Sequence, residues 1–284
     1  MTRSLPFTKM HGAGNDYVVL DGIRESLPAL EPLARRLSDR HFGVGFDQLL
    51  VARPSSHADF RMEIYNADGS QVEMCGNGLR AFLKFLRDAG HSDAEAVRIE
   101  TLSGVVVPRW VGENQVQVDM GPPVLAPAKI PTRLGDGAGD GPVVDAVLAL
   151  DGERLLVTAV SMGNPHAVLF VADVEQVPVD QLGPILESHA AFPNKVNVEF
   201  VQVLDRHRLR QRTWERGTGE TLACGSGACA VAVAAVLRGV AESPVTIALR
   251  GGELGIAWAG GQESVFLTGP AATVFTGSLI LEED

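Results

Sequence analysis

The sequence predicts an α+β fold of two pseudo-symmetric domains that arose by internal duplication, each with strands around one long helix. Two Cys-Gly-x-Gly turns, at Cys75 and Cys224, lie 149 residues apart in a chain of 284 residues. At the same offset the pair Gly14-Asn15 falls on Gly163-Asn164. A chain of this length accommodates two domains of ordinary size. A repeat this long indicates two similar domains rather than a solenoid.

Each half contains the same order of expected elements. A Gly-Asn turn runs into an apolar strand, and an amphipathic helix follows. We expect these strands at Tyr17–Leu20 and Ala167–Phe170, the helices at Leu30–Arg40 and Asp180–His189, and later Gly-rich hairpins at Ser103-Gly104 and Gly251-Gly252.

The longest helix of each half begins at the Cys-Gly-x-Gly turn. Asn77 and Ser226 occupy equivalent positions there and are residue types that favour the N-cap. Gly90 and Gly239 stand where helix-ending glycines are common. The second helix is apolar on all sides from Ala228 onward, which predicts that it is buried.

The Pro- and Gly-rich stretch 121–142 has almost no apolar periodicity and is the expected linker. We therefore expect an N-terminal half of residues 1–121 and a C-terminal half of residues 122–269. Residues 270–284 are expected to return to the first half as a strand.

Composition restricts the function. The net charge of −11 disfavours binding to nucleic acid or to anionic lipid. The longest apolar run, which starts at Ala228, is far shorter than the ~20 residues that span a bilayer. The first residues do not resemble a signal peptide. Three cysteines argue against a disulfide framework. We expect a cytoplasmic enzyme with free thiols that contacts neither nucleic acid nor membrane.

The two equivalent cysteines are the candidate reactive groups. Each precedes a helix N-terminus, where exposed amides and the helix dipole are expected to lower the thiol pKa and to bind an anion. Cys229 lies inside the apolar helix and is expected only to pack. The basic residues Arg80, Lys84 and Arg87 recur at helical spacing and predict a solvated helix face.

Two thiols that face each other across a bound carboxylate suit inversion of the neighbouring carbon. One thiolate removes the proton, and the opposing thiol returns a proton from the other side. Cysteine protease chemistry is disfavoured because it needs a thiol paired with a His base. No zinc-ligand spacing occurs, so no metal is expected. Pyridoxal phosphate stays open as a cofactor, although no lysine lies beside a Gly-rich phosphate loop; a cofactor-free reaction is favoured.

Equivalent positions that differ between the halves are expected to recognise an asymmetric substrate. The differing pairs are Asn66 with Glu215, Gln48 with Asn197, and Tyr17 with His166, whereas Asn15 and Asn164 are the same. Glu215 can hold an ammonium group, and Arg216 can bind a carboxylate. This set suits an amino acid with a charged far end.

Five motifs carry a resemblance that covers essentially the whole chain. They are Met10-His11-Gly12-Ala13-Gly14-Asn15-Asp16-Tyr17, Asn66-Ala67-Asp68-Gly69-Ser70, Glu73-Met74-Cys75-Gly76-Asn77-Gly78-Leu79-Arg80, Gly163-Asn164-Pro165-His166 and Glu215-Arg216-Gly217-Thr218-Gly219 continuing to Gly227. The chain resembles the diaminopimelate epimerase family. The resemblance implies a cytoplasmic, cofactor-independent homodimer that converts LL- to meso-diaminopimelate for lysine and peptidoglycan synthesis. It also implies two domains, each a mixed β-sheet or barrel around a central helix.

The resemblance also implies roles for individual residues. Cys75 would donate the proton and Cys224 would accept it in the LL-to-meso direction, with His166 beside the site. The backbone amides expected to hold the reacting carboxylate are those of Gly76, Asn77, Gly225 and Ser226. The residues expected to position the rest of the substrate are Asn15, Gln48, Asn66, Asn164, Asn197, Glu215 and Arg216. The commonest family motif has Phe in place of Tyr17, a change that we expect to be unimportant.

Two other functions remain open from the sequence. A racemase of the same fold would act on another amino acid, such as proline, hydroxyproline or histidine. A proline-type enzyme is expected to carry Cys-Gly-His-Gly, whereas this chain has Asn77 at the third position. The second alternative is an amino-acid-binding protein without catalysis, but binding alone needs no paired thiols.

Overall fold

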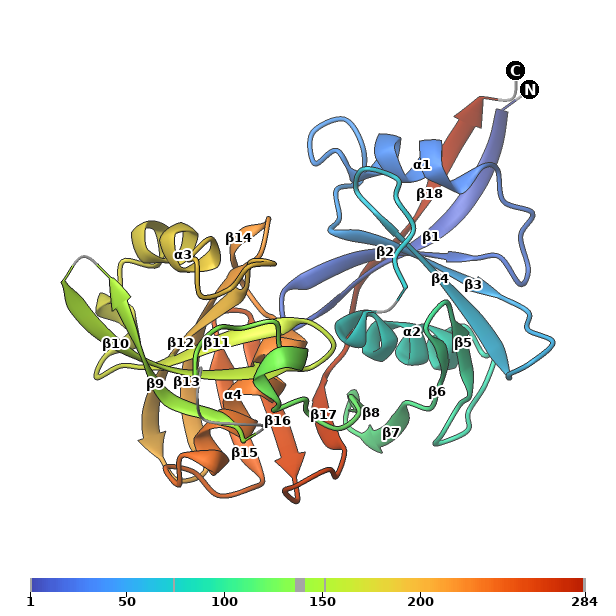
Figure 1. Ribbon diagram of the computed structural model, residues 1–284. Helices are drawn as coiled ribbons and strands as arrows, with labels where there is room; N and C mark the ends of the chain where they lie inside the picture. The colour runs from blue at the N-terminus through green and yellow to red at the C-terminus, as the bar shows by residue number, and fades with distance from the viewer. Residues whose placement is uncertain (1, 74, 136–140, 151, 283–284) are drawn as a thin grey trace. The chain divides into compact units, whose positions relative to one another are not determined.

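The structure is a computed structural model that describes residues 2–73, 75–135, 141–150 and 152–282 (Figure 1). Two compact units make up the chain: unit 1 comprises Met1–Val118 and Gly269–Asp284, and unit 2 comprises Asp119–Thr268. Met74 of the first cysteine motif lies outside the described residues. So do residues 136–140 of the expected linker and residues 283–284 of the expected returning strand.

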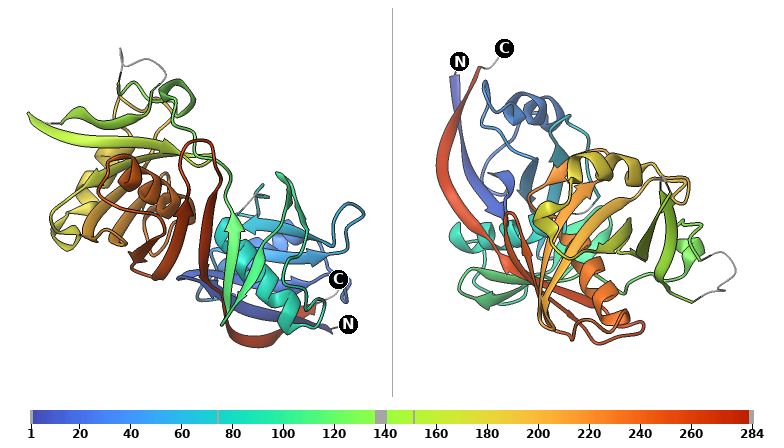
Figure 2. Two further views of the ribbon diagram at one scale, coloured as in Figure 1. Left: turned by 90° about the horizontal axis from the view of Figure 1, so that it is seen from below. Right: turned by 90° about the vertical axis from the view of Figure 1, so that its left-hand side faces the viewer.

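Unit 1 is built on a sheet with the strand order β18-β1-β2-β3-β4-β5-β6. Its strands are β1 (Thr2–Gly12), β2 (Asn15–Asp21), β3 (Gln48–Arg53), β4 (Phe60–Asn66), β5 (Ile99–Thr101), β6 (Gly104–Val106) and β18 (Ala272–Glu282). The last strand, β18, pairs antiparallel with β1, and the two run side by side toward the chain ends (Figure 2). A hairpin of β7 (Arg109–Gly112) and β8 (Gln115–Asp119) follows.

Unit 2 contains a sheet that runs in the order β17-β16-β15-β13-β12-β11-β10-β9, and β14 also pairs with β13. Its strands are β9 (Val143–Leu150), β10 (Glu153–Ser161), β11 (Pro165–Phe170), β12 (Asn197–Asp205), β13 (Arg208–Glu215), β14 (Gly219–Thr221), β15 (Val245–Leu249), β16 (Gly252–Trp258) and β17 (Val265–Pro270). Two short 3-10 turns, η1 (Pro127–Lys129) and η2 (Val174–Gln176), connect these elements.

The two units repeat one pattern of strand pairing, which confirms the predicted duplication within an α+β fold. From β1 to β6, the successive pairs are antiparallel, parallel, antiparallel, parallel and antiparallel. The series from β10 through β13 to β15 and β16 follows the same alternation. The register repeats as well: Tyr17 pairs with Gln48 as His166 pairs with Asn197. Residues that lie 149 positions apart in the sequence therefore occupy equivalent places in the two sheets.

One long helix lies against the sheet of each unit. In unit 1, α2 (Gly76–Asp88) contacts β1, β2, β3 and β18; in unit 2, α4 (Gly225–Leu237) contacts β10, β11, β12, β15 and β16. The apolar helix α4 is buried almost throughout, as predicted. Gly90 and Gly239 have positive φ and end the two helices. The following amides, of His91 and Val240, reach back to carbonyls in the last helical turn, the Schellman arrangement that glycine favours.

The two shorter helices were also predicted, with longer C-terminal ends. The structure has α1 at Leu30–Ser38 and α3 at Val179–Glu187. The first helix ends early because the Asp39 backbone leaves the helical region. The Asp39 carboxylate then accepts hydrogen bonds from the His41 and Phe42 amides. A short polar side chain of this kind competes with helix continuation.

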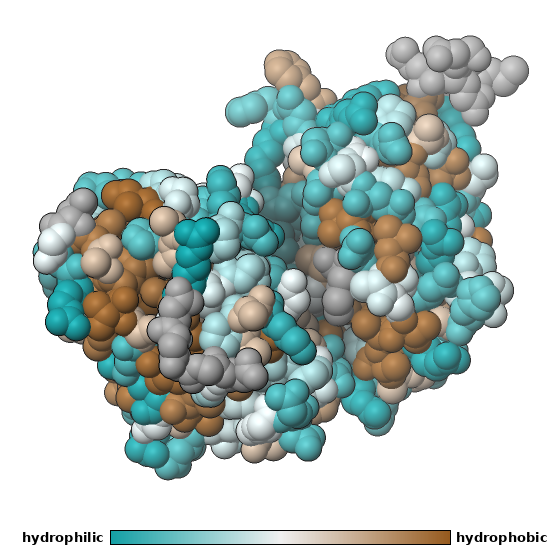
Figure 3. Space-filling view, viewed as in Figure 1, coloured by the Kyte–Doolittle hydropathy of each residue, from teal (hydrophilic) through white to brown (hydrophobic). Residues whose placement is uncertain are grey.

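The surface mixes polar and apolar residues on the face in Figure 3, and hydrophobic side chains gather over the β9–β10 hairpin. Val147 and Leu156, which are opposite each other in that hairpin, are both exposed. Within the described ranges, none of the helices has the length and apolar character to cross a membrane.

Candidate functional site

The two long helices begin with a cysteine as the N-cap residue, which corrects the predicted caps Asn77 and Ser226. The sulfur of Cys75 accepts a hydrogen bond from the Gly78 amide at 3.3 Å, and the sulfur of Cys224 accepts one from the Gly227 amide at 3.3 Å. Each cysteine has an extended backbone, as an N-cap requires. The prediction failed because residue preferences rank oxygen side chains first, whereas here sulfur fills that role in both units.

This capping places each sulfur beside the first amides of its helix. The Leu79 and Ala228 amides make the first backbone bonds to the cysteine carbonyls. The amides of Gly76 and Asn77 precede the first bond of α2, and those of Gly225 and Ser226 precede that of α4. Amides in these positions have no carbonyl partner within the helix and are suited to binding an anion. We call the groups around Cys75 half-site 1 and those around Cys224 half-site 2.

Half-site 1 has a phenol beside the thiol. The Tyr17 hydroxyl lies 3.6 Å from the Cys75 sulfur and donates a hydrogen bond to the Asn15 side-chain oxygen. Tyr17 is fully buried in β2, and burial raises its pKa well above the usual range. The expectation that the change from Phe is unimportant therefore overlooks a polar contact to the candidate reactive sulfur.

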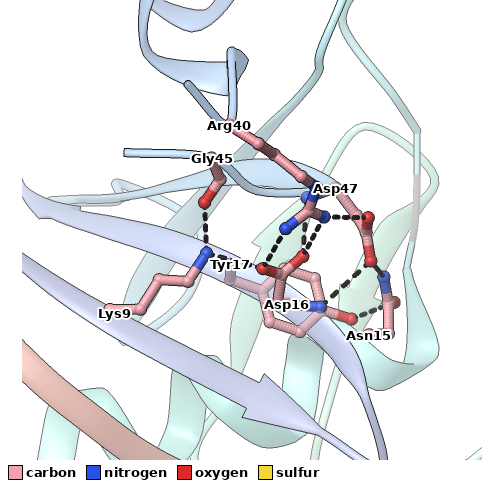
Figure 4. A network of polar contacts seen from close by, with 7 residues as sticks. All are labelled: Lys9, Asn15, Asp16, Tyr17, Arg40, Gly45 and Asp47. Atoms are coloured by element: carbon pink, nitrogen blue, oxygen red, sulfur yellow. Dashed lines mark hydrogen bonds and ion pairs between the residues drawn. The ribbon is translucent and has the colours of Figure 1, made fainter. Parts of the chain in front are cut away.

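A charged cluster holds Asn15 in place (Figure 4). The Asn15 amide nitrogen donates to one carboxylate oxygen of Asp47 at 2.7 Å, and Arg40 donates to the other at 2.9 Å. Arg40 also bonds both carboxylate oxygens of Asp16, at 2.9 and 3.0 Å, and Lys9 reaches Asp16 at 2.6 Å. Burial opposes ionisation of Asp16, but the hydrogen bonds from Arg40 and Lys9 lower its pKa to about 2.

A row of predicted site residues crosses the unit 1 sheet beside Tyr17. Gln48 pairs with Tyr17 on one side and with Asn66 on the other. The Gln48 amide nitrogen donates to the Asn66 side-chain oxygen at 3.1 Å, and Asn66 donates to the Ser70 hydroxyl at 3.1 Å. The structure thus brings two predicted site residues, on β3 and β4, into one row with Tyr17 on β2.

Arg80 is buried, which contradicts the predicted solvated face of α2. Its side chain has no exposed surface; it donates to the Asn77 side-chain oxygen at 2.7 Å and to the Pro270 carbonyl at 3.3 Å. Lys84 is mostly covered and pairs with Asp88. The prediction failed because the returning chain at Pro270, 190 residues later, covers this side of the helix. Arg80 therefore fixes the Asn77 side chain at the start of α2.

Half-site 2 replaces the phenol with an imidazole and a carboxylate. His166 is fully buried; its Nδ1 lies 2.8 Å from Glu199 Oε1, and its Nε2 lies 3.0 Å from the Asn164 side-chain oxygen. Glu199 is fully buried too, and burial raises its pKa, with His166 acting in the opposite direction. His166 therefore holds Asn164 as Tyr17 holds Asn15.

Further acidic and hydroxyl groups surround Cys224. The Ser226 hydroxyl lies 3.5 Å from its sulfur. Glu215 accepts a hydrogen bond from Thr221 at 2.6 Å, and burial raises the Glu215 pKa. Burial followed by the charges of Glu215 and Glu199 raises the pKa of Cys224 well above its usual range.

The thiol pKa values differ from the expectation. Burial raises the pKa of Cys75, while the bonds from Tyr17 and the Gly78 amide and the Arg80 charge act in the lowering direction. The predicted lowering by the helix start is thus wrong for both sulfurs, because loss of water around each sulfur outweighs the helix amides. The pKa of Cys224 rises further than that of Cys75, because the groups near Cys224 are acidic.

The remaining predicted residues are Asn197 and Arg216. The Asn197 side chain donates to the Pro165 carbonyl at 3.1 Å and accepts from the Arg216 backbone amide at 2.9 Å. The Arg216 side chain is exposed, and its guanidinium donates to the Asn194 carbonyl at 2.9 Å. Asn197 thus fixes the backbone at Arg216 and leaves the guanidinium at the surface.

Comparison with known proteins identifies the family of this chain. A model of the family described as diaminopimelate epimerase matches residues 7–126 and 158–274. A diaminopimelate epimerase from Aromatoleum aromaticum is 51% identical over 278 residues, which cover 97% of this chain and 99% of the relative. The chain belongs to the diaminopimelate epimerase family. A second family member, from Cupriavidus taiwanensis, is 52% identical over 281 residues, covering 98% of each chain.

Solved structures with the same fold are more distant in sequence than these family members. A phenazine biosynthesis protein of the PhzF family from Bacillus anthracis aligns with a TM-score of 0.70 at 15% identity, covering 98% of this chain and 100% of the other. A hydroxyproline epimerase from Agrobacterium vitis aligns with a TM-score of 0.66 at 16% identity, covering 99% and 94%. At such identities the similarity concerns the fold alone.

The sequence reasoning missed three residues that contact predicted site residues in this family member. They are Asp47, which holds Asn15; Arg80, which holds Asn77; and Glu199, which holds His166. Two of them had a usable signal at the offset of 149 residues: Glu199 replaces Leu50 of the first half, in the middle of an apolar strand, and Arg80 falls on Cys229, in the middle of an apolar helix. A carboxylate in such a strand is seldom buried without a function or a partner.

Proposed function

We propose that this chain epimerises LL-2,6-diaminopimelate to meso-diaminopimelate, for lysine and peptidoglycan synthesis, by a cofactor-independent two-base mechanism. The observation that carries the proposal is the equivalent placement of Cys75 and Cys224 as N-caps of the two long helices. A binding protein would not need thiols at both positions. The membership of the diaminopimelate epimerase family supports this substrate over other amino acids.

In the LL-to-meso direction, the Cys224 thiolate removes the α-proton and the Cys75 thiol delivers a proton to the opposite side of the carbon. The electron pair of the broken C–H bond passes onto the neighbouring carboxylate. We assign the stabilisation of that developing charge to the backbone amides of Gly76, Asn77, Gly225 and Ser226, which are fixed before the reaction. In the reverse direction the sulfurs exchange roles.

The rest of the substrate carries a second ammonium and a second carboxylate. We assign its recognition to seven side chains: Asn15, Gln48, Asn66, Asn164, Asn197, Glu215 and Arg216. Glu215 would accept from an ammonium group, and Arg216 would bind a carboxylate once its guanidinium leaves the Asn194 carbonyl. We place His166 beside the site as the residue that orients Asn164.

We also propose the bounds of the two halves, the oligomeric state and the location of the enzyme in the cell. We assign the two halves of the duplication to residues 1–121, with 270–284 returning to them, and to residues 122–269. We infer a homodimer, because the edge strand β18 exposes the apolar side chains of Val274, Phe275 and Ile280. Unpaired strand edges with apolar residues favour association with another chain. We place the enzyme in the cytoplasm, where thiols stay reduced.

The test is to incubate the full chain with LL-diaminopimelate in deuterated water, without added cofactor or metal. We expect meso-diaminopimelate that carries solvent deuterium at one α-carbon, detected by chiral chromatography and NMR. Parallel assays use proline, trans-4-hydroxyproline and histidine. Turnover of one of these in place of LL-diaminopimelate would identify a different racemase. Absence of exchange with every amino acid tested would leave only a binding function.

A further inference from the structure

Tyr17 connects the candidate acid–base group Cys75 to a residue proposed to bind substrate. Its ring is fully buried in β2, and its hydroxyl contacts two polar atoms. One is the side-chain oxygen of Asn15, which accepts its hydrogen bond, and the other is the Cys75 sulfur at 3.6 Å. A phenol can both donate and accept a hydrogen bond. It is therefore able to interact with a thiol as well as with a thiolate.

The neighbouring charges fix the direction of these hydrogen bonds (Figure 4). Asp47 is held by Arg40, a group that only donates, and its carboxylate therefore accepts from the Asn15 amide nitrogen at 2.7 Å. This contact turns the Asn15 oxygen toward Tyr17, so the phenol donates to Asn15. The phenol oxygen is then left to accept from the S–H group of Cys75.

A two-base reaction changes the protonation of Cys75 in every turnover. While Cys75 is a thiol, the arrangement above satisfies both groups. When Cys75 becomes a thiolate, it can only accept, and rotation about the phenolic C–O bond lets the Tyr17 hydroxyl donate to the sulfur. No heavy atom has to move for this exchange of partners. Hydrogen bonds to ionised acceptors are also the stronger ones.

We propose that Tyr17 is a positioning residue for Cys75, whose hydroxyl donates to Asn15 while the sulfur is protonated and to the sulfur when it is ionised. This inference rests on the proposed two-base function, because only that function makes Cys75 alternate between the two states. It assigns a role to the Tyr17 hydroxyl, which we expected from the sequence to be unimportant.

The surroundings of the two sulfurs support this assignment. The titratable and charged groups that face Cys75 are Tyr17 on β2 and Arg80 on α2, and Asp47 faces Tyr17 from the segment before β3. The hydrogen bond from Tyr17 and the Arg80 charge act to lower the pKa of Cys75, against burial. Cys224 has His166 in the position of Tyr17. The acidic groups near Cys224 raise its pKa further. The two sulfurs are therefore inequivalent, with Cys75 the easier to ionise.

The first test compares Tyr17→Phe with Tyr65→Phe, which removes the chain's other phenol from β4 and serves as the matched control. Alkylation of Cys75 by iodoacetamide is followed from pH 7 upward until it reaches a plateau, by peptide mass spectrometry, with Cys224 as the internal reference. We expect the Cys75 midpoint in Tyr17→Phe to rise by about one pH unit, the effect of one lost hydrogen bond to a charged acceptor. The Cys224 midpoint and both midpoints in Tyr65→Phe should stay unchanged.

An unchanged Cys75 midpoint, or an equal shift at Cys224, would overturn the assignment. The measurement reads thiol ionisation and does not require turnover. A wild-type chain without epimerase activity would therefore overturn the proposed function separately, while the alkylation profile still decides whether Tyr17 acts on Cys75.

A second variant tests the connection through Asn15. Asp47→Asn removes the carboxylate that turns the Asn15 oxygen toward Tyr17, which is the arrangement that suits the protonated sulfur. We therefore expect a small fall of the Cys75 midpoint, opposite in direction to the rise in Tyr17→Phe. In a Tyr17→Phe background, the same Asp47→Asn change should add almost nothing, because it acts through the missing hydroxyl. If the midpoint shifts of the two single variants add in the double variant, Asp47 does not act on Cys75 through the Tyr17 hydroxyl.

Epimerase kinetics give a third readout. At pH 7 we expect kcat/KM of Tyr17→Phe in the meso-to-LL direction, in which the Cys75 thiolate is the base, to fall about 3- to 10-fold, because a pKa rise of up to about one unit reduces the ionised fraction of Cys75 by that factor. The fall must be equal in both directions, because the equilibrium constant between the substrates is fixed. The activity should approach the wild-type value as the pH rises through the raised Cys75 midpoint of the variant. A fall that persists unchanged at high pH would point to a disturbed structure and contradict the proposal.

Discussion

The Oε1 atom of Glu199 lies 2.8 Å from the position that a Cβ atom would take at Gly227. The Gly227 amide also donates to the Cys224 sulfur, so glycine at this position lets the buried carboxylate and the thiol share one helix start. At the equivalent Gly78, the nearest atoms to such a Cβ belong to Cys75 at 3.3 and 3.4 Å and to the Leu50 side chain at 3.4 Å. The space is therefore tighter in unit 2.

This difference predicts unequal effects of the same substitution. Gly227→Ala should lower the free energy of unfolding by about 1–3 kcal/mol, because the new methyl group overpacks against a buried carboxylate. Gly78→Ala should change it by less than about 1 kcal/mol, since the helix preference of alanine offsets the mild crowding. Urea unfolding of both variants measures this. Equal destabilisation would show that Glu199 moves aside without cost.

The capping role of the cysteines separates stability from activity. Cys75→Ser and Cys224→Ser should keep most of the stability, since serine is a good N-cap, but lose epimerase activity because a hydroxyl is far less acidic than a thiol. The corresponding alanine variants should lose the activity and also about 1 kcal/mol of unfolding free energy. Assays of epimerisation and thermal unfolding measure the two effects.

The third cysteine is the control for these substitutions. Cys229 is fully buried inside α4, away from the helix start. Cys229→Ala should retain most of the epimerase activity, with a small loss of stability from the reduced packing. An inactive Cys229→Ala enzyme that remains folded would mean that the reactive pair has been assigned wrongly.

Much of the fold was predictable because duplication leaves a signal in the sequence itself. The offset that relates Cys75 to Cys224 also relates Tyr17 to His166, and both rings proved to hold an equivalent asparagine. Glycine at Gly90 marked a helix end correctly because a positive φ at that position favours glycine. The repeat and the helix end can both be predicted from one sequence, because they depend on residue types at particular positions and not on contacts between distant segments.

The errors concern contacts between distant parts of the chain. Helical spacing placed Arg80 on one face of α2 but could not tell that the chain at Pro270 covers that face. The pKa of each thiol was predicted from the helix start alone, whereas burial decides its direction. Burial follows from tertiary packing, and the residue types next to Cys75 do not specify it.

The proposed homodimer predicts a specific effect at β18. Phe275→Glu places a charge on the exposed edge strand and should convert the dimer to a monomer, because an unpaired charge in an apolar interface is costly. The matched control is Phe42→Glu, at a phenylalanine of unit 1 that is 94% exposed and lies outside β18. Light scattering after size-exclusion chromatography measures the mass. A dimeric Phe275→Glu protein would exclude this edge from the interface.

The charged cluster around Asp16 predicts how stability depends on pH. Its pKa is about 2 in the folded chain against 3.8 as the ordinary value, so the cluster stabilises the fold fully above about pH 5 and loses this contribution as the pH falls toward 2. Asp16→Asn should lower the unfolding free energy by about 1–2 kcal/mol at pH 7, after allowance for solvent screening. The difference from the wild type should shrink between pH 5 and pH 3 in urea unfolding.

The exposed carboxylate of Glu263 provides the control, Glu263→Gln, which should show almost no difference at any pH. A deficit in Asp16→Asn that stays constant down to pH 3 would mean that the side chain stabilises by packing and not by charge.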